Sequence, residues 1–151
     1  MAEIQQVLID SLPQGKLAAS NYRVASAPMP SPADGEVLVR TLAFAITAGT
    51  RAGLQGSASY AGAPRAGVVM NGTGVGEVVE SRDPGVRVGA RVMGPTGWQS
   101  HCVLKAGELS VIPDDHDPVQ YLGPLGVNGL TAYFGLLEVG QPRAGETVMV
   151  S

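Results

Sequence analysis

Two histidines and a single cysteine are the side chains of this sequence best suited to metal binding or nucleophilic chemistry. His101 and Cys102 are adjacent in a β-type run, so their side chains are expected to point to opposite faces of a strand. His116 lies in the acidic run 114–117, which indicates a solvated loop leading into a helix. One cysteine can supply neither an internal disulfide nor a cysteine-rich zinc cage. The sequence therefore predicts no metal site and favours a reducing, cytoplasmic compartment.

A glycine-rich string over residues 71–77 invites comparison with nucleotide-binding loops. A dinucleotide fingerprint places G-x-G-x-x-G after a strand and at the start of a helix, where backbone amides meet the pyrophosphate. Here the position of the third glycine is Glu77, and the residues after it continue as a strand. The string therefore predicts a turn that leads into a strand of the domain.

Three other side chains could face a substrate. Tyr60 lies in a loop of glycine, alanine and serine, where a phenol can face a pocket and donate a hydrogen bond to a carbonyl. The alternative is that its ring packs against the rest of the domain. Trp98 is expected either in the core or in the wall of a cleft. Ser57 lacks the strand-to-helix elbow of a serine hydrolase, so acyl transfer is not indicated.

The elements that must position these side chains are short strands. The chain has 151 residues, of which 21 are glycine, 11 are proline and only 15% are charged, and this composition favours many turns over surface helix. Over the first two thirds of the chain, β-type runs between turns predict a compact barrel or sandwich. The runs are Gln6–Asp10, Tyr22–Ala25, Val37–Thr47, Gly74–Ser81, Arg91–Met93, Gln99–Leu104 and Leu109–Ile112.

The pattern then changes to that of a helix. Apolar residues at i, i+3, i+4 and i+7 form one stripe and predict a helix over 128–139. Asn128 is placed to cap its start, and Gly140 with Pro142 is placed to end it. The stripe consists of Leu130, Tyr133, Phe134 and Leu137.

The last five residues, Thr147–Ser151, form a continuous apolar run that is typical of a strand buried on both faces of a parallel sheet. Parallel strands are joined by crossovers of a dozen or more residues, so a single strand of this kind has no neighbour of its own. We therefore expect these 151 residues to be the N-terminal part of a longer protein.

Charge and hydropathy narrow the choice of partners. Ten basic and thirteen acidic residues give a net charge of −3, and no lysine or arginine cluster is present. This argues against nucleic acid or an anionic membrane as the main partner. No apolar run approaches the length of a membrane span, and the N-terminus lacks the features of a signal peptide. The glycosylation sequon at Asn71 is therefore interpreted as an ordinary turn.

Five segments resemble the zinc-independent medium-chain dehydrogenases/reductases, in particular the branch of alkenal/one double-bond reductases that includes the prostaglandin reductases. The resemblance implies a mainly β, GroES-like distorted barrel over 1–121. It also implies that 122–151 begins a Rossmann α/β domain for NADP with its first helix and strand. The segments are Val69–Gly76, Val88–Gly94, Gly97–Leu104, Leu125–Leu137 and Ala144–Ser151.

The resemblance further implies a reaction and the residues that take part in it. NADPH would give a hydride to the β-carbon of an α,β-unsaturated aldehyde or ketone, and the resulting enolate would then be protonated. By position, Val127, Asn128 and Thr131 would lie against the nicotinamide, while Tyr60 and Thr50 would border the substrate. No residue of this chain is assigned as catalytic. The phosphate loop would follow the last residue, so residues 1–151 alone are expected to be inactive and to bind NADPH poorly.

The segment Ala48–Gly53 departs from the family pattern Asp-Pro-Tyr/Ala-Met-Arg-Gly. Thr50 stands where the family can have an aromatic wall, and Arg51 is displaced by one position from the family arginine, which leaves substrate shape and the role of Arg51 open. A quinone reductase of the same superfamily is one alternative. A stand-alone GroES-like module without catalysis is another. The expected partner is a small enone or quinone, and the resemblance allows a homodimer formed through the nucleotide domain.

Overall fold

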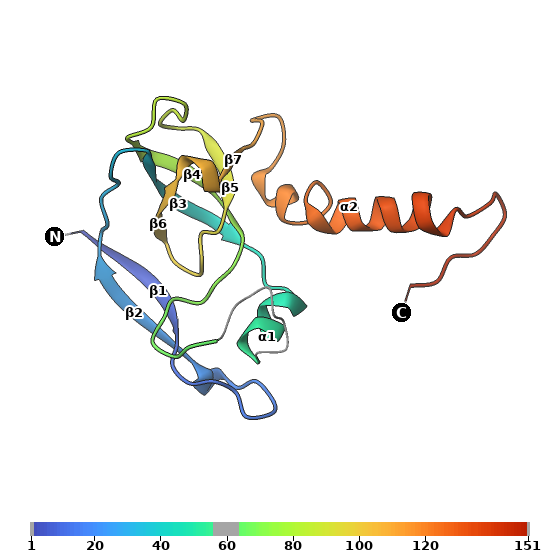
Figure 1. The fold of residues 1–151 in the computed structure, drawn as a ribbon, viewed down its shortest axis with the longest axis horizontal. Coiled ribbons are helices and arrows are strands. Elements are labelled where there is room, and N and C mark those ends of the chain that lie inside the picture. The colour runs from blue at the N-terminus through green and yellow to red at the C-terminus, as the bar shows by residue number, and fades with distance from the viewer. Residues whose placement is uncertain (1, 56–63, 151) are drawn as a thin grey trace.

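The computed structural model describes residues 2–55 and 64–150, which form a strand-rich body followed by a helical tail (Figure 1). A two-stranded sheet pairs β1 with β2, and a five-stranded antiparallel sheet has the order β6-β3-β4-β5-β7. The mainly β architecture predicted from the turn pattern is confirmed. The strands are β1 (Glu3–Ile9), β2 (Tyr22–Pro28), β3 (Glu36–Phe44), β4 (Gly74–Ser81), β5 (Arg91–Gly94), β6 (His101–Lys105) and β7 (Ser110–Val111).

Helical segments separate the strands and form the tail. Two α-helices and a π-helix are accompanied by three short 3-10 turns in the described residues. The helices are α1 (Ala48–Leu54), α2 (Val127–Tyr133) and the π-helix η5 (Phe134–Gly140), and the 3-10 turns are η1 (Ala19–Asn21), η3 (Ala106–Glu108) and η4 (Pro118–Leu122). No helix in the part of the chain that the structure describes is both long enough and apolar enough to cross a membrane.

Backbone hydrogen bonds from β1 join the two sheets. The amide of Val7 donates to the carbonyl of Trp98 at 2.8 Å, and the amide of Ser100 donates to the carbonyl of Gln5 at 2.9 Å. Further along β1, the amide of Ile9 donates to the carbonyl of Val68 at 2.9 Å. These bonds satisfy an edge that would otherwise be open, and they close the sheets into a distorted barrel.

Alternation along β3 places one set of side chains in the core. Val37 and Val39 are fully buried, whereas Arg40 lies on the outside and pairs with Glu77 of β4 (Nη2 to Oε2 2.6 Å). Cys102, opposite Val39 in the register, is also buried. The main cluster consists of Val37, Val39, Val78, Val86, Ala90, Val92, Cys102 and Leu104.

The burial of Cys102 has a chemical consequence. His101, its neighbour on β6, is half-buried on the opposite face, as the strand alternation predicted. Burial raises the pKa of the Cys102 thiol to about 11, so it is protonated at neutral pH. The two side chains therefore do not act as a pair.

One predicted strand ends early because a helix begins. The run Val37–Thr47 was expected as one strand, but β3 ends at Phe44 and α1 starts at Ala48. Thr47 is the cap of α1: its hydroxyl accepts from the amide of Thr50 at 3.3 Å, and the Thr50 hydroxyl accepts from the amide of Thr47 at 3.4 Å. This reciprocal pair offers the backbone an alternative to the strand and explains the difference.

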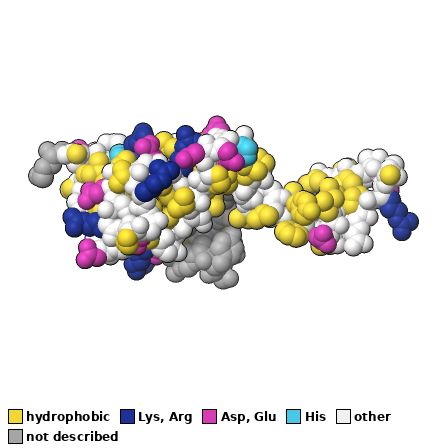
Figure 2. All heavy atoms as spheres, turned by 90° about the horizontal axis from the view of Figure 1, so that it is seen from above, with side chains coloured by type: hydrophobic (Ala, Val, Ile, Leu, Met, Phe, Trp, Pro, Cys, Tyr) yellow, Lys and Arg dark blue, Asp and Glu magenta, His cyan; other side chains and the backbone are white. Residues whose placement is uncertain are grey.

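The tail projects away from the barrel, and hydrophobic side chains gather on its surface (Figures 1 and 2). Its helical segment ends at Gly140 with Pro142 just beyond, as predicted, and Gln141 adopts a left-handed conformation between them (φ 46°). The start differs, because α2 begins at Val127 with Gly126 at the cap, and Asn128 lies inside the first turn.

The predicted strand Thr147–Ser151 is not formed in the described residues, which reach Val150. Val148, Met149 and Val150 are all exposed. A parallel strand gains its hydrogen bonds only from neighbouring strands, and the described tail offers it none, so the apolar pattern alone does not produce a strand here.

Candidate functional site

A cleft of about 790 Å³ lies between the barrel and the beginning of the tail. Its barrel side is formed by the segment that follows β3 with the first turn of α1, by the loop 71–73, and by Met93 with Pro95. Its tail side is formed by η4 and the first turn of α2. Segments that are far apart in the sequence thus meet at one cavity. The tail contributes Tyr121, Leu122, Val127 and Asn128.

The loop 71–73 is fixed to the barrel by its backbone. The carbonyl of Thr73 accepts from the amide of Ala45 at 2.8 Å, and the carbonyl of Gly72 accepts from the amide of Gly97 at 3.0 Å. β4 follows directly at Gly74, so the glycine-rich string is a turn leading into a strand, as predicted. The fixed backbone makes this loop a rigid wall of the cleft.

Trp98 supports that wall from behind. Its ring stacks between Tyr22 (centroid distance 5.6 Å) and Phe44 (5.3 Å), and it packs on the small core cluster that contains Met70. A Cβ atom at Gly72 would lie 2.9 Å from the indole Nε1, so only glycine fits. Trp98 is therefore half-buried against the core, and it also lines a separate pocket of about 280 Å³, so both predicted settings apply to it; it does not line the 790 Å³ cleft.

Three residues assigned by resemblance lie together at this cleft. Thr50 lines it from α1, and Val127 and Asn128 line it from α2. Thr131 lies one turn further along α2, outside the lining, and its hydroxyl donates to the carbonyl of Val127 at 2.7 Å. Tyr60 lies outside the residues that the structure describes.

The lining carries neutral polar groups and apolar surface. It includes no acidic or basic side chain among the described residues. The side-chain amides of Asn71 and Asn128 make no hydrogen bond to a described residue, so both are available to a ligand. Thr50 adds a hydroxyl. A neutral, partly enclosed cleft with a few amide and hydroxyl groups suits a polarised carbonyl compound better than an ionic ligand.

No cluster of three or more His, Cys, Asp or Glu residues that could hold a metal ion occurs in the described ranges 2–55 and 64–150. His116 is exposed, and its nearest acidic contact is Asp115, with Nε2 3.9 Å from the carboxylate. The two sequence motifs that suggested metal chemistry therefore do not come together here.

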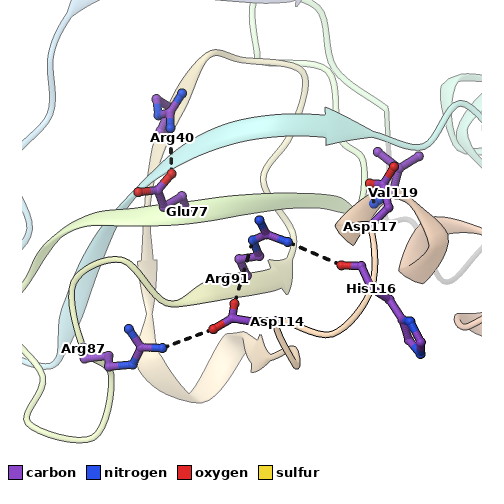
Figure 3. Close-up of polar contacts among 8 residues, drawn as sticks. All are labelled: Arg40, Glu77, Arg87, Arg91, Asp114, His116, Asp117 and Val119. Carbon is purple, nitrogen blue, oxygen red and sulfur yellow. Dashed lines mark hydrogen bonds and ion pairs between the residues drawn. The ribbon is translucent and has the colours of Figure 1, made fainter.

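An arginine-carboxylate cluster holds the segment that carries the tail side of the cleft (Figure 3). Asp114 lies between Arg87 (3.4 Å) and Arg91 (3.8 Å), and the Arg91 guanidinium also donates to the carbonyl of His116 at 3.3 Å. Asp117 then begins η4 by accepting from the amide of Val119 at 3.0 Å. The predicted acidic loop before a helix is confirmed, but its attachment to β5 was not visible in the sequence.

Comparison with known proteins places the chain in a family. Residues 5–112 match the family described as the N-terminal domain of oxidoreductase, and the chain belongs to that family. The match includes all seven described strands, and only the first two residues of β1 lie outside it. The class defined by fold and family is thus that of the barrel domain of an oxidoreductase.

Individual relatives show which oxidoreductases the chain is similar to. The chain is 35% identical over 145 residues to the NADPH-dependent curcumin reductase of Escherichia coli, which covers 95% of this chain and 42% of the relative. It is 33% identical over 136 residues to prostaglandin reductase 1 of Bos taurus, which covers 87% of this chain and 39% of the relative. The chain therefore spans about two fifths of the length of these curated relatives.

A solved structure gives the same likeness in three dimensions. The crystal structure of CurA from Vibrio vulnificus in complex with NADPH superposes with a TM-score of 0.83 at 31% identity, over 94% of this chain and 42% of that one. The GroES-like barrel expected from the sequence resemblance agrees with this likeness. The relatives are NADPH-dependent or prostaglandin reductases by name, as the resemblance to double-bond reductases implied.

Proposed function

We propose that the whole protein is an NADPH-dependent reductase of the carbon–carbon double bond of α,β-unsaturated aldehydes and ketones, and that the cleft between barrel and tail holds the reacting groups. The observation that carries the proposal is the convergence of Thr50, Val127 and Asn128 on one neutral cleft. The likeness to reductases of this kind supports it. Residues 122–151 would then begin the nucleotide domain, and residues 1–121 would be the substrate domain.

The cleft fits one end of the cofactor. A nicotinamide ring with its carboxamide suits a neutral lining that presents the Asn128 amide and the apolar side chain of Val127. The phosphates find no lysine or arginine among the described lining residues, so they belong elsewhere in the whole protein. When bound, NADPH supplies the hydride that is added to the β-carbon of the substrate.

The residues of this chain orient the two partners. The Asn128 side chain would hydrogen-bond the carboxamide, and Val127 would cover the ring and exclude water. Thr131 would help only as an acceptor, because its proton is already donated to the carbonyl of Val127. On the barrel side, the Thr50 hydroxyl and the Asn71 amide are placed to hold the substrate oxygen as negative charge develops on it. Tyr60 is proposed for the same task.

The test is NADPH oxidation by the purified complete protein with a panel of small enals, enones and quinones, read as loss of NADPH absorbance. Reduction of enals and enones at the double bond supports the proposal. Turnover of quinones alone would replace it with the quinone reductase alternative. An intact mass of 15.5 kDa for the natively expressed protein, together with no turnover, would favour the stand-alone module.

Two further properties are part of the proposal. A cytoplasmic location is supported by the single, buried cysteine, since proteins without disulfides are typical of reducing compartments. A homodimer through the nucleotide domain is supported by the family resemblance. Cell fractionation and light scattering on the complete protein test the two properties directly, and a monomer in solution would refute the second.

A further inference from the structure

Two of the three asparagines in the chain are followed directly by glycine, and both of these line the 790 Å³ cleft. They are Asn71 of the loop 71–73 and Asn128 of α2, whereas the third, Asn21, precedes a tyrosine. Asparagine is a chemically labile residue, and a following glycine has no side chain to obstruct attack of its backbone nitrogen on the asparagine amide. The two sites therefore combine the same local chemistry with different structural settings.

At Asn71 both the attacking nitrogen and the amide are free. The Asn71 side chain makes no hydrogen bond to a described residue, and the backbone nitrogen of Gly72 donates none either. The loop is anchored instead through the carbonyls of Gly72 and Thr73. Asn71 is exposed and lines both the cleft and a second pocket of about 260 Å³, so water reaches its side chain. A reaction between these two groups breaks no hydrogen bond of the described structure.

The other two asparagines are held in place. The backbone nitrogen of Gly129, which would attack Asn128, donates to the carbonyl of Gly123 at 3.2 Å within the first turn of α2. The carbonyl of Pro124 also lies against Gly129, where no Cβ atom would fit. Asn21 is buried, and both ends of its side-chain amide are hydrogen-bonded. The structure thus singles out one asparagine of the three.

We propose that Asn71 is a site of spontaneous deamidation, which places a carboxylate in the wall of the neutral cleft and inactivates the enzyme as it ages. The nitrogen of Gly72 bonds to Cγ of Asn71, and the side-chain nitrogen leaves as ammonia with the proton of the Gly72 amide. The product is a cyclic imide. Water then opens the imide at one of its two carbonyls, which gives either aspartate or isoaspartate, whose main chain runs through the side-chain carbons.

The new carboxylate changes the chemistry of the cleft. The lining has no acidic or basic side chain among the described residues, so a charge at position 71 is the first in it. A hydrogen-bond donor is lost where the Asn71 amide and the Thr50 hydroxyl are proposed to hold the substrate oxygen, and a negative charge appears where negative charge must develop. The loss of activity therefore rests on the proposed function, whereas the reaction at Asn71 does not.

The experiment follows the three asparagines by peptide mass spectrometry while the complete protein is incubated at mildly alkaline pH, both folded and in urea. Each event adds the mass difference between an amide and an acid, and enzymatic methylation detects isoaspartate. The unfolded chain is the reference, because both Asn-Gly sites are equally free there. Asn71→Gln lengthens the side chain so that the ring no longer closes readily, and Asn128→Gln is the matched control. Reduction of an enone is measured on the same samples.

In the folded protein Asn71 is expected to react about as fast as in urea. Asn128 should react about tenfold more slowly, because the first turn of α2 must open before Gly129 can attack. Asn128→Gln should leave the rate at Asn71 unchanged, and Asn71→Gln should remove the time-dependent loss of activity. Asn71→Asp should lower kcat/KM for the enone about a hundredfold, as the loss of one donor to a developing oxyanion does.

The two parts of the inference fail in distinguishable ways. If Asn71 stays intact in the folded protein while it reacts in urea, or if it reacts no faster than Asn128, the modification site is wrong. If Asn71 is modified but the enone is still reduced, and Asn71→Asp is as active as wild type, the modification stands and the inactivation is wrong. If fresh wild-type protein reduces no enone at all, the proposed function fails and the inactivation with it, while the mass spectra still decide the site.

Discussion

Replacement of Gly72 by alanine should damage the cleft wall through its contact with Trp98. The added Cβ atom would lie 2.9 Å from Nε1 and 3.0 Å from Cδ1 of the indole, about half an ångström short of ordinary van der Waals contact. The indole cannot move away freely because it is stacked between Tyr22 and Phe44. Such overpacking costs about 1–3 kcal/mol of folding free energy.

The measurement is thermal and urea unfolding of the complete protein, with Gly107→Ala as the matched control. A Cβ atom at Gly107 would meet no described atom within 4 Å, and the backbone there is not left-handed, so the same change should cost little. A Trp98→Phe variant shortens the ring system that Gly72 faces, and combining it with Gly72→Ala should recover part of the loss. Equal stability of Gly72→Ala and Gly107→Ala would refute the reasoning.

Three other changes have definite expected outcomes. Asp114→Asn removes the ion pairs with both arginine partners, and because these pairs are exposed the change should cost less than about 1 kcal/mol of folding free energy. It should nevertheless raise KM for the substrate measurably, because the segment that it holds continues into η4, which forms one wall of the cleft. Thr47→Ala removes the cap of α1 and should cost about 1 kcal/mol in urea unfolding; Thr47→Ser, which keeps the hydroxyl, should not. The thiol of Cys102 should resist iodoacetamide at neutral pH in the folded protein and react after unfolding. Burial raises the pKa of this thiol from 9.0 to about 11, so the protonated thiol contributes to the free energy of unfolding below pH 9, and this contribution should be lost as the pH rises from 9 to 11. Fast alkylation of the folded protein at pH 7 would contradict the burial of the thiol.

The barrel could be predicted because its signals are local. Alternating apolar residues bounded by proline and glycine turns marked each strand, and β4 was predicted with the bounds that the structure shows, Gly74–Ser81. The α1 helix was missed because its cap, Thr47, is the last residue of a run that reads as β-type, and its reciprocal hydrogen bonds with Thr50 are not visible in that pattern. The tail strand was predicted from its apolar run and from the family resemblance, together with its lack of a neighbour, and the described residues indeed offer it no strand to pair with.

The candidate site was predicted only in part. The family resemblance pointed to Thr50, Val127 and Asn128, and all three line one cleft, although their roles remain proposals. Asn71 was interpreted as part of a turn, and its position between two cavities depends on the tertiary fold. The same is true of Arg91, whose contacts with Asp114 and the carbonyl of His116 join residues more than twenty positions apart. Contacts of this kind leave no periodic signal in a sequence.

Because β3 is the central strand of its sheet, the two walls of the cleft differ in their stability against local opening. β3 is hydrogen-bonded on both sides, to β4 and to β6, and it continues directly into the wall formed by Ala45 and α1. The opposite wall belongs to η4 and α2, which contain no buried residue in their own helical turns. Amide hydrogen exchange should therefore be slow in β3 and fast in α2. A ligand that spans the cleft would contact the stable wall next to β3 and would stabilise the wall formed by η4 and α2. Its binding should therefore be detected chiefly as slower amide exchange in α2.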